Sequence, residues 1–530
     1  MTSTLTSADE SPAVPDKLDK RVLVIAGVVV LGAIMSILDI TVVSVALPTW
    51  EREFGATTTD VAWTHTAYTL ALAVVIPLTG WAADRFGPKR LYIVALALFT
   101  LGSVLCAFAT SLPMLITFRV LQGFGGGMLM PLGMTILTKA AGPDRIGRVM
   151  AAMGVPMLLG PIFGPILGGW LIDNLSWHWI FLINLPIGIG AMVYAWFALD
   201  ADDVHPSETF DFVGVLLLSP GLALFLYGIS SIPEAKQAHG TIFTNTVVGC
   251  ALAGVALIAA FCFWALNKRN AHPLLDLTLF RNRNLTVAVI AMILFGIAFS
   301  GSSLLLPKFF QDVQSFSPTG SGGMLAPQGI GAMVMMPIAG ALVDRIGPGK
   351  IVLTGVALVT AGLGMFALVG YDTGKLFVFA SLFVMGLGMG ATMMPIMTAA
   401  LATLREAAIA RGSTMMNIIS QVGNACGAAI FSVLFMDNLL SSKEAQGAMA
   451  VNGFEAENGV AADPSVLAGI AQQVGLDPAT FTVDGAFTAL ASTFTDTFVI
   501  ATVLIALVLV PALFLPRHKV AAPEGVMVGH

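Results

Sequence analysis

Two residues of opposite charge stand inside otherwise apolar stretches of the sequence. Asp39 lies in LDITVVSVALP, and Arg119 begins RVLQGFGGG. An unpaired carboxylate is costly to bury in an apolar helix, so we expect Asp39 to be paired, protonated or facing a wet cavity. At 1.5 Å per residue, both residues lie roughly 10–14 Å below the outer ends of their stretches. The matching depth indicates that the two side chains form a pair.

Such a pair has two possible uses. Burial and a neighbouring positive charge act in opposite directions on the proton affinity of a carboxyl group. Proton uptake by Asp39 can then depend on conformation, which is what coupling to transport requires. The alternative is a static ion pair that holds two helices together.

The composition places these residues in a membrane protein. The chain of 530 residues is 57% hydrophobic and 11% charged, with a mean hydropathy of +0.88, whereas soluble domains carry about 25% charged residues. The four cysteines lie inside apolar runs and are expected to be small core residues without disulfides. The sequence contains no G-x-x-x-x-G-K-[ST], H-E-x-x-H or G-x-S-x-G motif. We therefore expect neither an ATP-driven pump nor an enzyme, and no metal or cofactor.

Taking about 20 apolar residues as one crossing, we predict an all-α protein with fourteen transmembrane helices. Nineteen of the 25 Lys and Arg then fall in inner segments and five in outer loops, which places both termini in the cytoplasm. The inner segment 200–211, DADDVHPSETFD, contains no base and is predicted to be a solvated linker. The predicted spans are 22–48, 61–83, 91–109, 112–138, 148–172, 179–199, 212–231, 244–267, 284–306, 321–343, 351–370, 376–402, 412–436 and 487–515.

The sequence repeats itself across its two halves. GWAADRFGPKR at 80–90 matches GALVDRIGPGK at 340–350, and GGGMLMPLGMTIL at 125–137 matches GMGATMMPIMTAAL at 388–401. The offsets relate span 2 to span 10 and span 4 to span 12, so we predict two related six-helix bundles around a central site. The expected organisation is a cytoplasmic tail (1–20), an N-terminal bundle (21–199), a linker with two inserted helices (200–283), a C-terminal bundle (284–515) with a long outer loop (437–486), and a cytoplasmic tail (516–530).

Four stretches carry a family resemblance that covers about residues 20–515: the two already quoted around Asp39 and Arg119, GPIFGPILGGW at 160–170, and DRFGPK at 84–89. The chain resembles the major facilitator superfamily, and within it the 14-span drug:H⁺ antiporters of the EmrB/QacA type. The resemblance implies proton-driven export of amphipathic or hydrophobic compounds by alternating access across a prokaryotic plasma membrane. It also implies that Asp39 is the protonation site and Arg119 its modulator.

The stretch GPIFGPILGGW is rich in residues that are small or bend a helix. Small residues let helix backbones approach closely, and prolines kink them. Generic tight packing is one interpretation, whereas the resemblance marks the stretch as the antiporter motif. The residues concerned are Gly160, Pro161, Gly164, Pro165, Gly168 and Gly169.

The repeated polar hinge has the composition of a conformational latch on the inner side. Asp84 could accept hydrogen bonds from the N-terminus of span 13 near Gly412, and Asp344 from span 5 near Arg148. Two halves would then close together and separate once per cycle. The alternative is a loop that only sets topology. The predicted latch residues are Gly80, Asp84, Arg85, Gly87, Asp344 and Arg345.

Polar residues inside spans are the candidates for contact with substrate. The three in span 13 step by four and three residues, so they share one helical face, although hydrogen bonds between helices are nearly as plausible a role. The predicted substrate-cavity residues are Tyr68, Gln122, Gln328, Asn417, Gln421 and Asn424. In the outer loop, SVLAGIAQQVG at 465–475 has the pattern of an amphipathic helix.

Two other functions remain open at this stage. One is export of a specific lipid or metabolite, which a substrate profile would distinguish. The other is a transporter-like sensor, which a flux assay would distinguish. The expected partners are protons, small amphipathic or hydrophobic molecules and the lipid bilayer, with no nucleic acid. The chain is expected to act as a monomer.

Overall fold

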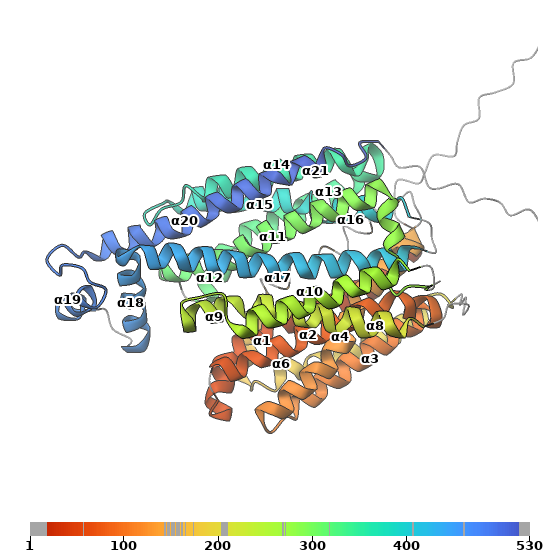
Figure 1. The fold of residues 1–530 in the computed structure, drawn as a ribbon, viewed down its shortest axis with the longest axis horizontal. Helices are drawn as coiled ribbons and strands as arrows, with labels where there is room; N and C mark the ends of the chain where they lie inside the picture. The colour runs from red at the N-terminus through yellow and green to blue at the C-terminus, as the bar shows by residue number, and fades with distance from the viewer. Residues whose placement is uncertain are drawn as a thin grey trace, which may run out of the picture.

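The structure is a computed structural model in which every regular element among the described residues is a helix (Figure 1). It describes residues 19–518 except 57, 142–144, 146–148, 150–153, 155–159, 161–162, 165, 173, 203–209, 268–269, 271, 317, 405–407 and 459–461. Thirteen helices in these ranges are long and apolar enough to cross a membrane. The all-α membrane fold is therefore confirmed. The predicted fifth span, 148–172, falls largely outside the described residues, so the count of fourteen stays a prediction.

The N-terminal helices contact one another as one group. They form a bundle in which α4 contacts α1, α2 and α3, and α7 contacts α1 and α3. This group occupies the lower part of Figure 1, coloured red to orange. Its members are α1 (Lys20–Phe54), α2 (Thr58–Phe86), α3 (Pro88–Ala107), α4 (Leu112–Ala141), α6 (Trp179–Leu182) and α7 (Asn184–Ala198).

The C-terminal helices form the second group, in the upper part of Figure 1. Within it α11 contacts α17 and α20, and α15 contacts α13 and α14. The members are α11 (Arg283–Asp312), α12 (Pro318–Met324), α13 (Ala326–Ile346), α14 (Pro348–Phe366), α15 (Lys375–Gly390), α16 (Met393–Leu401), α17 (Ile409–Ser441), α20 (Val483–Leu507) and α21 (Leu509–Ala512).

Three helices lie between the groups: α8 (Phe212–Ser230), α9 (Ile232–His239) and α10 (Asn245–Ala265). Helices α8 and α10 correspond to the predicted inserted pair, and the short α9 connects them. Helix α8 and the residues just before it contact α2. Tyr227 stacks on Trp63 at 5.6 Å near the outer end, and Phe210 lies 4.5 Å from Trp81 near the inner end. Between them, Ser219 Oγ donates to the Val74 carbonyl at 2.7 Å. The inserted pair also contacts α17, so it bridges the two groups.

The repeated hinge has the same backbone conformation in both halves. Gly87 has φ 86° and Gly347 has φ 87°, and each is followed by the proline that begins the next helix. This left-handed region is one that glycine adopts without the steric cost of a side chain. Different segments of the chain hydrogen-bond to the two hinges. Asp202 accepts from the backbone N–H of Lys89 at 2.8 Å, whereas the Pro516 carbonyl accepts from Gly349 N at 2.8 Å.

The acidic segment 200–211 is more than a solvated linker. Asp200 pairs with Arg21, Asp202 binds the start of α3, and Asp211 is buried at the start of α8. The described ends of this segment are thus held by donors from neighbouring segments, which explains acids where the other inner segments carry bases. The prediction of a solvated linker was wrong for the buried Asp211, whereas Asp200 and Ala201 are exposed, and 203–209 lie outside the described residues.

The outer loop contains two helices, α18 (Lys443–Asn458) and α19 (Pro464–Gln473), at the far left of Figure 1. Helix α19 confirms the helix predicted at 465–475, whereas α18 was not predicted. Helix α18 packs on α20, and Asn452 Nδ2 donates to the Asp312 carbonyl at 2.6 Å. The loop is therefore docked on the outer end of the C-terminal group.

Candidate functional site

Asp39 and Arg119 meet inside the N-terminal group. Arg119 Nη1 lies 2.5 Å from Asp39 Oδ2, joining α4 to α1. Asp39 is 2% exposed and Arg119 is 0% exposed. Apart from Asp211 at the start of α8, they are the only charged residues buried in the described parts of the chain. The pairing expected from their matching depths is present in the structure.

Gln122 completes the pair and extends it into a network. Its Oε1 accepts from Arg119 Nη1 at 2.7 Å, while its Nε2 donates to Asp39 Oδ1 at 2.7 Å and to Ser103 Oγ at 2.6 Å. Asn184 Nδ2 donates to the same Ser103 oxygen at 3.0 Å. The network therefore connects α1, α3, α4 and α7.

The guanidinium of Arg119 makes further contacts with α2. Its Nε donates to the Thr64 carbonyl at 3.1 Å, and its central carbon lies 4.1 Å from the centroid of the Tyr68 ring. Tyr68 Oη is 3.3 Å from Ser36 Oγ. Arg119 Nη2 is buried without a hydrogen-bond acceptor among the described residues. Tyr68 and Gln122, expected in a substrate cavity, are instead fully buried around the ion pair.

Sequence reasoning missed Ser103, Asn184 and Thr64 in this network. Asn184 was recognisable as a polar residue inside the apolar run WHWIFLINLPIG. Ser103 gives no such signal, because serine is common in membrane helices and commonly bonds its own backbone. Thr64 contributes through its carbonyl group, which every residue possesses.

The small residues of the predicted antiporter motif lie against the part of α1 that carries Asp39. Thr41 Oγ1 donates to the Gly160 carbonyl at 3.1 Å. A Cβ on Gly160 would meet Ile37, one on Gly164 would meet Thr41, and one on Gly168 would lie 3.0 Å from a methyl group of Val42. Gly169 faces open space, and Pro161 and Pro165 lie outside the described residues. The glycines therefore permit close packing beside the ion pair.

The predicted latch on α2 contacts the beginning of α17. Arg411 Nε lies 3.5 Å from Asp84 Oδ2. At Gly80, an added Cβ would lie 3.1 Å from Thr414 Oγ1 and 3.5 Å from the Arg411 backbone. The partner segment is the one predicted, but the contact shown there is with the side chain of Arg411. Arg85 and Arg345 are exposed, and the expected partner of Asp344 near Arg148 lies outside the described residues.

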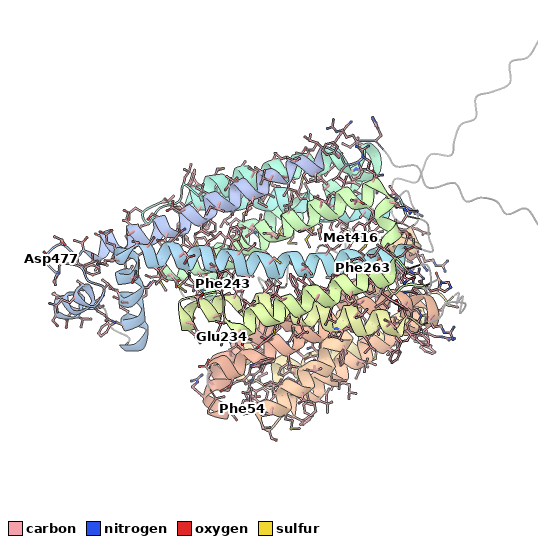
Figure 2. All side chains as sticks on the ribbon, viewed as in Figure 1. Phe54, Glu234, Phe243, Phe263, Met416 and Asp477 are labelled. Carbon is pink, nitrogen blue, oxygen red and sulfur yellow. The ribbon has the colours of Figure 1, made fainter. Side chains whose placement is uncertain are left out.

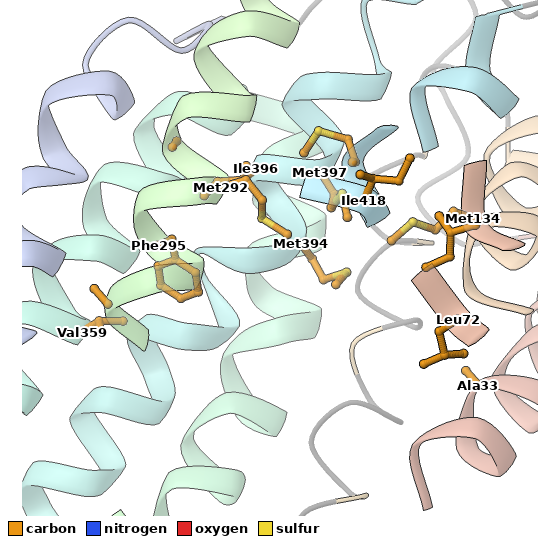
Figure 3. Close-up of a cluster of buried hydrophobic side chains, with 14 of the residues drawn as sticks. Ala33, Leu72, Met134, Met292, Phe295, Val359, Met394, Ile396, Met397 and Ile418 are labelled. Atoms are coloured by element: carbon orange, nitrogen blue, oxygen red, sulfur yellow. The ribbon is translucent and has the colours of Figure 1, made fainter. Parts of the chain in front are cut away.

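Further contacts join the two groups near the same end. Thr135 Oγ1 lies 3.3 Å from Ser413 Oγ, and Asn417 Nδ2 lies 3.4 Å from Met134 Sδ. Figure 3 shows Met134 on the N-terminal side of this contact and Ile418 on the C-terminal side. In the orientation predicted from the charge bias of the loops, these contacts lie at the inner end.

A cavity of about 360 Å³ lies within the C-terminal group. Gln328 and Asn424 line it, together with apolar side chains that include Met292 and Phe295 of α11 (Figure 3). Gln421 is outside its lining, although Ser420 belongs to it. The polar residues expected to form one substrate cavity are therefore divided among this cavity, the ion pair and, for Asn417, the inner contact.

The comparisons with known proteins agree with this architecture. Residues 29–428 match the family model of the Major Facilitator Superfamily. The Multidrug resistance protein B homolog of Mycobacterium tuberculosis is 47% identical over 515 residues, covering 95% of this chain and 92% of that protein. The Multidrug export protein EmrB of Haemophilus influenzae is 32% identical over 410 residues, covering 76% and 79%.

Two solved structures share the fold at low sequence identity. The human organic anion transporter MFSD10 superposes with a TM-score of 0.57 at 16% identity, covering 92% of this chain and 100% of that one. The proton:xylose symporter XylE superposes with a TM-score of 0.53 at 15% identity, covering 91% and 94%. With the EmrB-like relatives, these findings confirm the resemblance carried by the four stretches: the chain is a multi-pass membrane transporter that belongs to the Major Facilitator Superfamily.

Proposed function

We propose that this transporter exports amphipathic or hydrophobic compounds in exchange for protons, by alternating access across a prokaryotic plasma membrane. The observation that carries the proposal is the buried network of Asp39, Arg119 and Gln122. The names of the relatives, multidrug resistance and export proteins, support the cargo class.

The energetics of the network support a role in coupling. Removing one partner of a buried ion pair typically costs about 3–5 kcal/mol, because the remaining charge is left uncompensated. A proton on Asp39 would leave Arg119 in that condition, in a site closed to water. Protonation and a rearrangement of α1 against α4 should therefore occur together, which links proton uptake to a change of conformation.

The cavity in the C-terminal group supports the proposed cargo. Its lining is mostly apolar, with Ser300, Ser303, Gln328, Ser420 and Asn424 as polar contacts. Pockets for drug-sized ligands have this composition, with broad apolar contact and a few orienting hydrogen bonds. Met292, Met389 and Met393 add adaptable side chains suited to varied shapes. In the proposed cycle, the contact at Asp84 and Arg411 must open for cargo to enter from the inner side.

The test is transport in proteoliposomes with ethidium as the probe and an imposed pH gradient. We expect the wild type to move ethidium against its gradient until an ionophore collapses the pH difference. Asp39→Asn should bind ethidium but not concentrate it, whereas Asp39→Glu, which keeps the carboxylate, should retain part of the activity. Gradient-driven transport by Asp39→Asn at the wild-type rate would refute the assigned role of Asp39.

A further inference from the structure

The inserted pair and the C-terminal group enclose a second cavity, which the proposed transport cycle does not use. Its volume is about 440 Å³, and it is lined by α8, α10, the segment 275–280, α11 and α17. Every lining residue is aliphatic, aromatic, a methionine or a cysteine; Leu222, Ile258, Cys262 and Ile419 are examples. The site therefore suits a ligand part without polar groups.

The cavity extends from the inner half of the membrane to about its middle. Its lining includes Leu218, six residues into α8, and Val422, thirteen residues into α17. At 1.5 Å per residue these positions are about 9 and 20 Å from the inner helix ends, whereas one leaflet of hydrocarbon is about 15 Å thick. Val255, which lines the cavity, is 48% exposed. Phe263, labelled in Figure 2, belongs to the same helix and is 80% exposed. Val255 lies ten residues from the inner end of α10, about 15 Å at 1.5 Å per residue. The cavity is therefore open to lipid near the middle of the membrane, at the depth that the end of an acyl chain from the inner leaflet reaches.

A buried carboxylate holds the inner end of this cavity in place. One oxygen of Asp211 accepts from Gly214 N and Trp264 Nε1, both at 2.8 Å. The other accepts from Asn270 Nδ2 and Leu274 N, both at 3.0 Å. Because Leu275 and Leu277 line the cavity, the carboxylate fixes the segment that forms its inner wall to both inserted helices.

Positive charge stands at the inner mouth. Phe280 lines the cavity, Arg281 follows it directly, and Arg283 begins α11 two residues later. Both arginines are exposed. Basic side chains at the inner surface attract anionic lipid headgroups, and a guanidinium can bind a phosphate through two hydrogen bonds.

We propose that this cavity binds an acyl chain of an anionic phospholipid from the inner leaflet, with Arg281 and Arg283 contacting its phosphate. The chain would fill the space between the inserted pair and α17. The acyl chain would also give these helices an apolar contact that can adjust when the N-terminal and C-terminal halves move relative to each other. The proposal concerns a resident lipid and does not depend on the cargo or on proton coupling.

Native mass spectrometry of the full chain, delipidated in detergent and titrated with single lipids, tests the proposal. We expect dioleoylphosphatidylglycerol to bind more tightly than dioleoylphosphatidylcholine. Arg281→Gln with Arg283→Gln should weaken phosphatidylglycerol binding about thirtyfold, since each of the two basic residues contributes roughly 1 kcal/mol to anionic lipid binding. The double substitution should leave phosphatidylcholine binding unchanged. Equal affinity for both lipids, or no effect of the double substitution, would overturn the proposal.

A cavity-filling substitution locates the site. Ala259→Trp places an indole in the cavity lining, whereas Leu252→Trp places one on the same helix at a position that is 64% exposed and outside the lining. We expect the first to abolish tight phosphatidylglycerol binding and the second to leave it intact. Equal effects of the two substitutions on phosphatidylglycerol binding would show that the lipid does not bind in this cavity. Displacement of the lipid by ethidium, one for one, would show that the cavity holds cargo instead.

Discussion

At the scale of single residues, the site depends on how one arginine distributes its donors. Arg119 reaches Asp39 and Gln122 through Nη1 and the Thr64 carbonyl through Nε, and its face lies over Tyr68. It thereby holds three helices at fixed distances from one carboxylate. A lysine provides the charge but not the planar fork of donors.

Arg119→Lys should therefore lower ethidium transport about tenfold or more, the effect of losing roughly 1.5–3 kcal/mol in a charged hydrogen bond, while ethidium binding persists. The measurement is initial transport rate in proteoliposomes beside a binding titration. Arg52→Lys, at the exposed outer end of α1, is the matched control and should behave as wild type. Equal transport by the two variants would mean that charge alone is sufficient at position 119.

The sequence was sufficient to predict which charges meet, and insufficient to predict what surrounds them. Asp39 and Arg119 are identifiable because charges inside apolar helices are rare and their depths can be counted. Gln122 was assigned to the substrate cavity because an amide is equally suited to binding cargo or to bridging an ion pair. Only the positions of neighbouring side chains distinguish the two roles, and helical periodicity does not provide them.

At the scale of helices, the glycines of the predicted span 5 determine how closely this segment can pack against α1. Gly160, Gly164 and Gly168 lie where Cβ atoms would meet Ile37, Thr41 and Val42, while Gly169 faces open space. The sequence predicted that these small residues allow close helix packing. It did not predict that the helix packed against them is α1. The hinge glycines show the same limit. The repeated sequence predicts a similar turn in both halves, but it does not predict that Asp202 contacts one turn and Pro516 the other.

Gly164→Val should reduce ethidium transport about tenfold, because overpacking typically costs 1–3 kcal/mol and here would displace the turn that carries Asp39. Gly169→Val is the control, with the same change five residues further along the chain, and should transport at close to the wild-type rate. Thermal unfolding in detergent would check that both variants fold. A Gly164→Val protein as active as its control would contradict the role of this contact.

At the scale of the whole molecule, the inserted pair is attached unequally to the two halves. Helix α8 and the preceding Phe210 are joined to α2 by two aromatic contacts and a hydrogen bond. Towards α17 there are the apolar cavity and a half-exposed ion pair between Lys236 of α9 and Asp437 at 2.6 Å. Ion pairs at the protein surface contribute little, about 0–1 kcal/mol. We expect the pair to move with the N-terminal half.

Electron–electron distance measurements between spin labels at the outer ends test this expectation. With cysteines replacing Glu53 of α1, His239 of α9 and Ser441 of α17, in a protein whose native cysteines are serine, two distances are compared as pH and ethidium shift the conformation. The distance from 53 to 239 should stay constant, while that from 239 to 441 should change. The reverse pattern would show that the inserted pair moves with the C-terminal half.

The central claim is that cargo binding and the proton on Asp39 are linked. The most direct measurement is proton release by purified protein in weakly buffered detergent solution when ethidium is added, followed with a pH indicator. The account predicts that the wild type releases protons in proportion to the ethidium bound. Asp39→Asn should bind ethidium and release none. Proton release by Asp39→Asn equal to that of the wild type would contradict the account, because the coupled proton would then reside elsewhere.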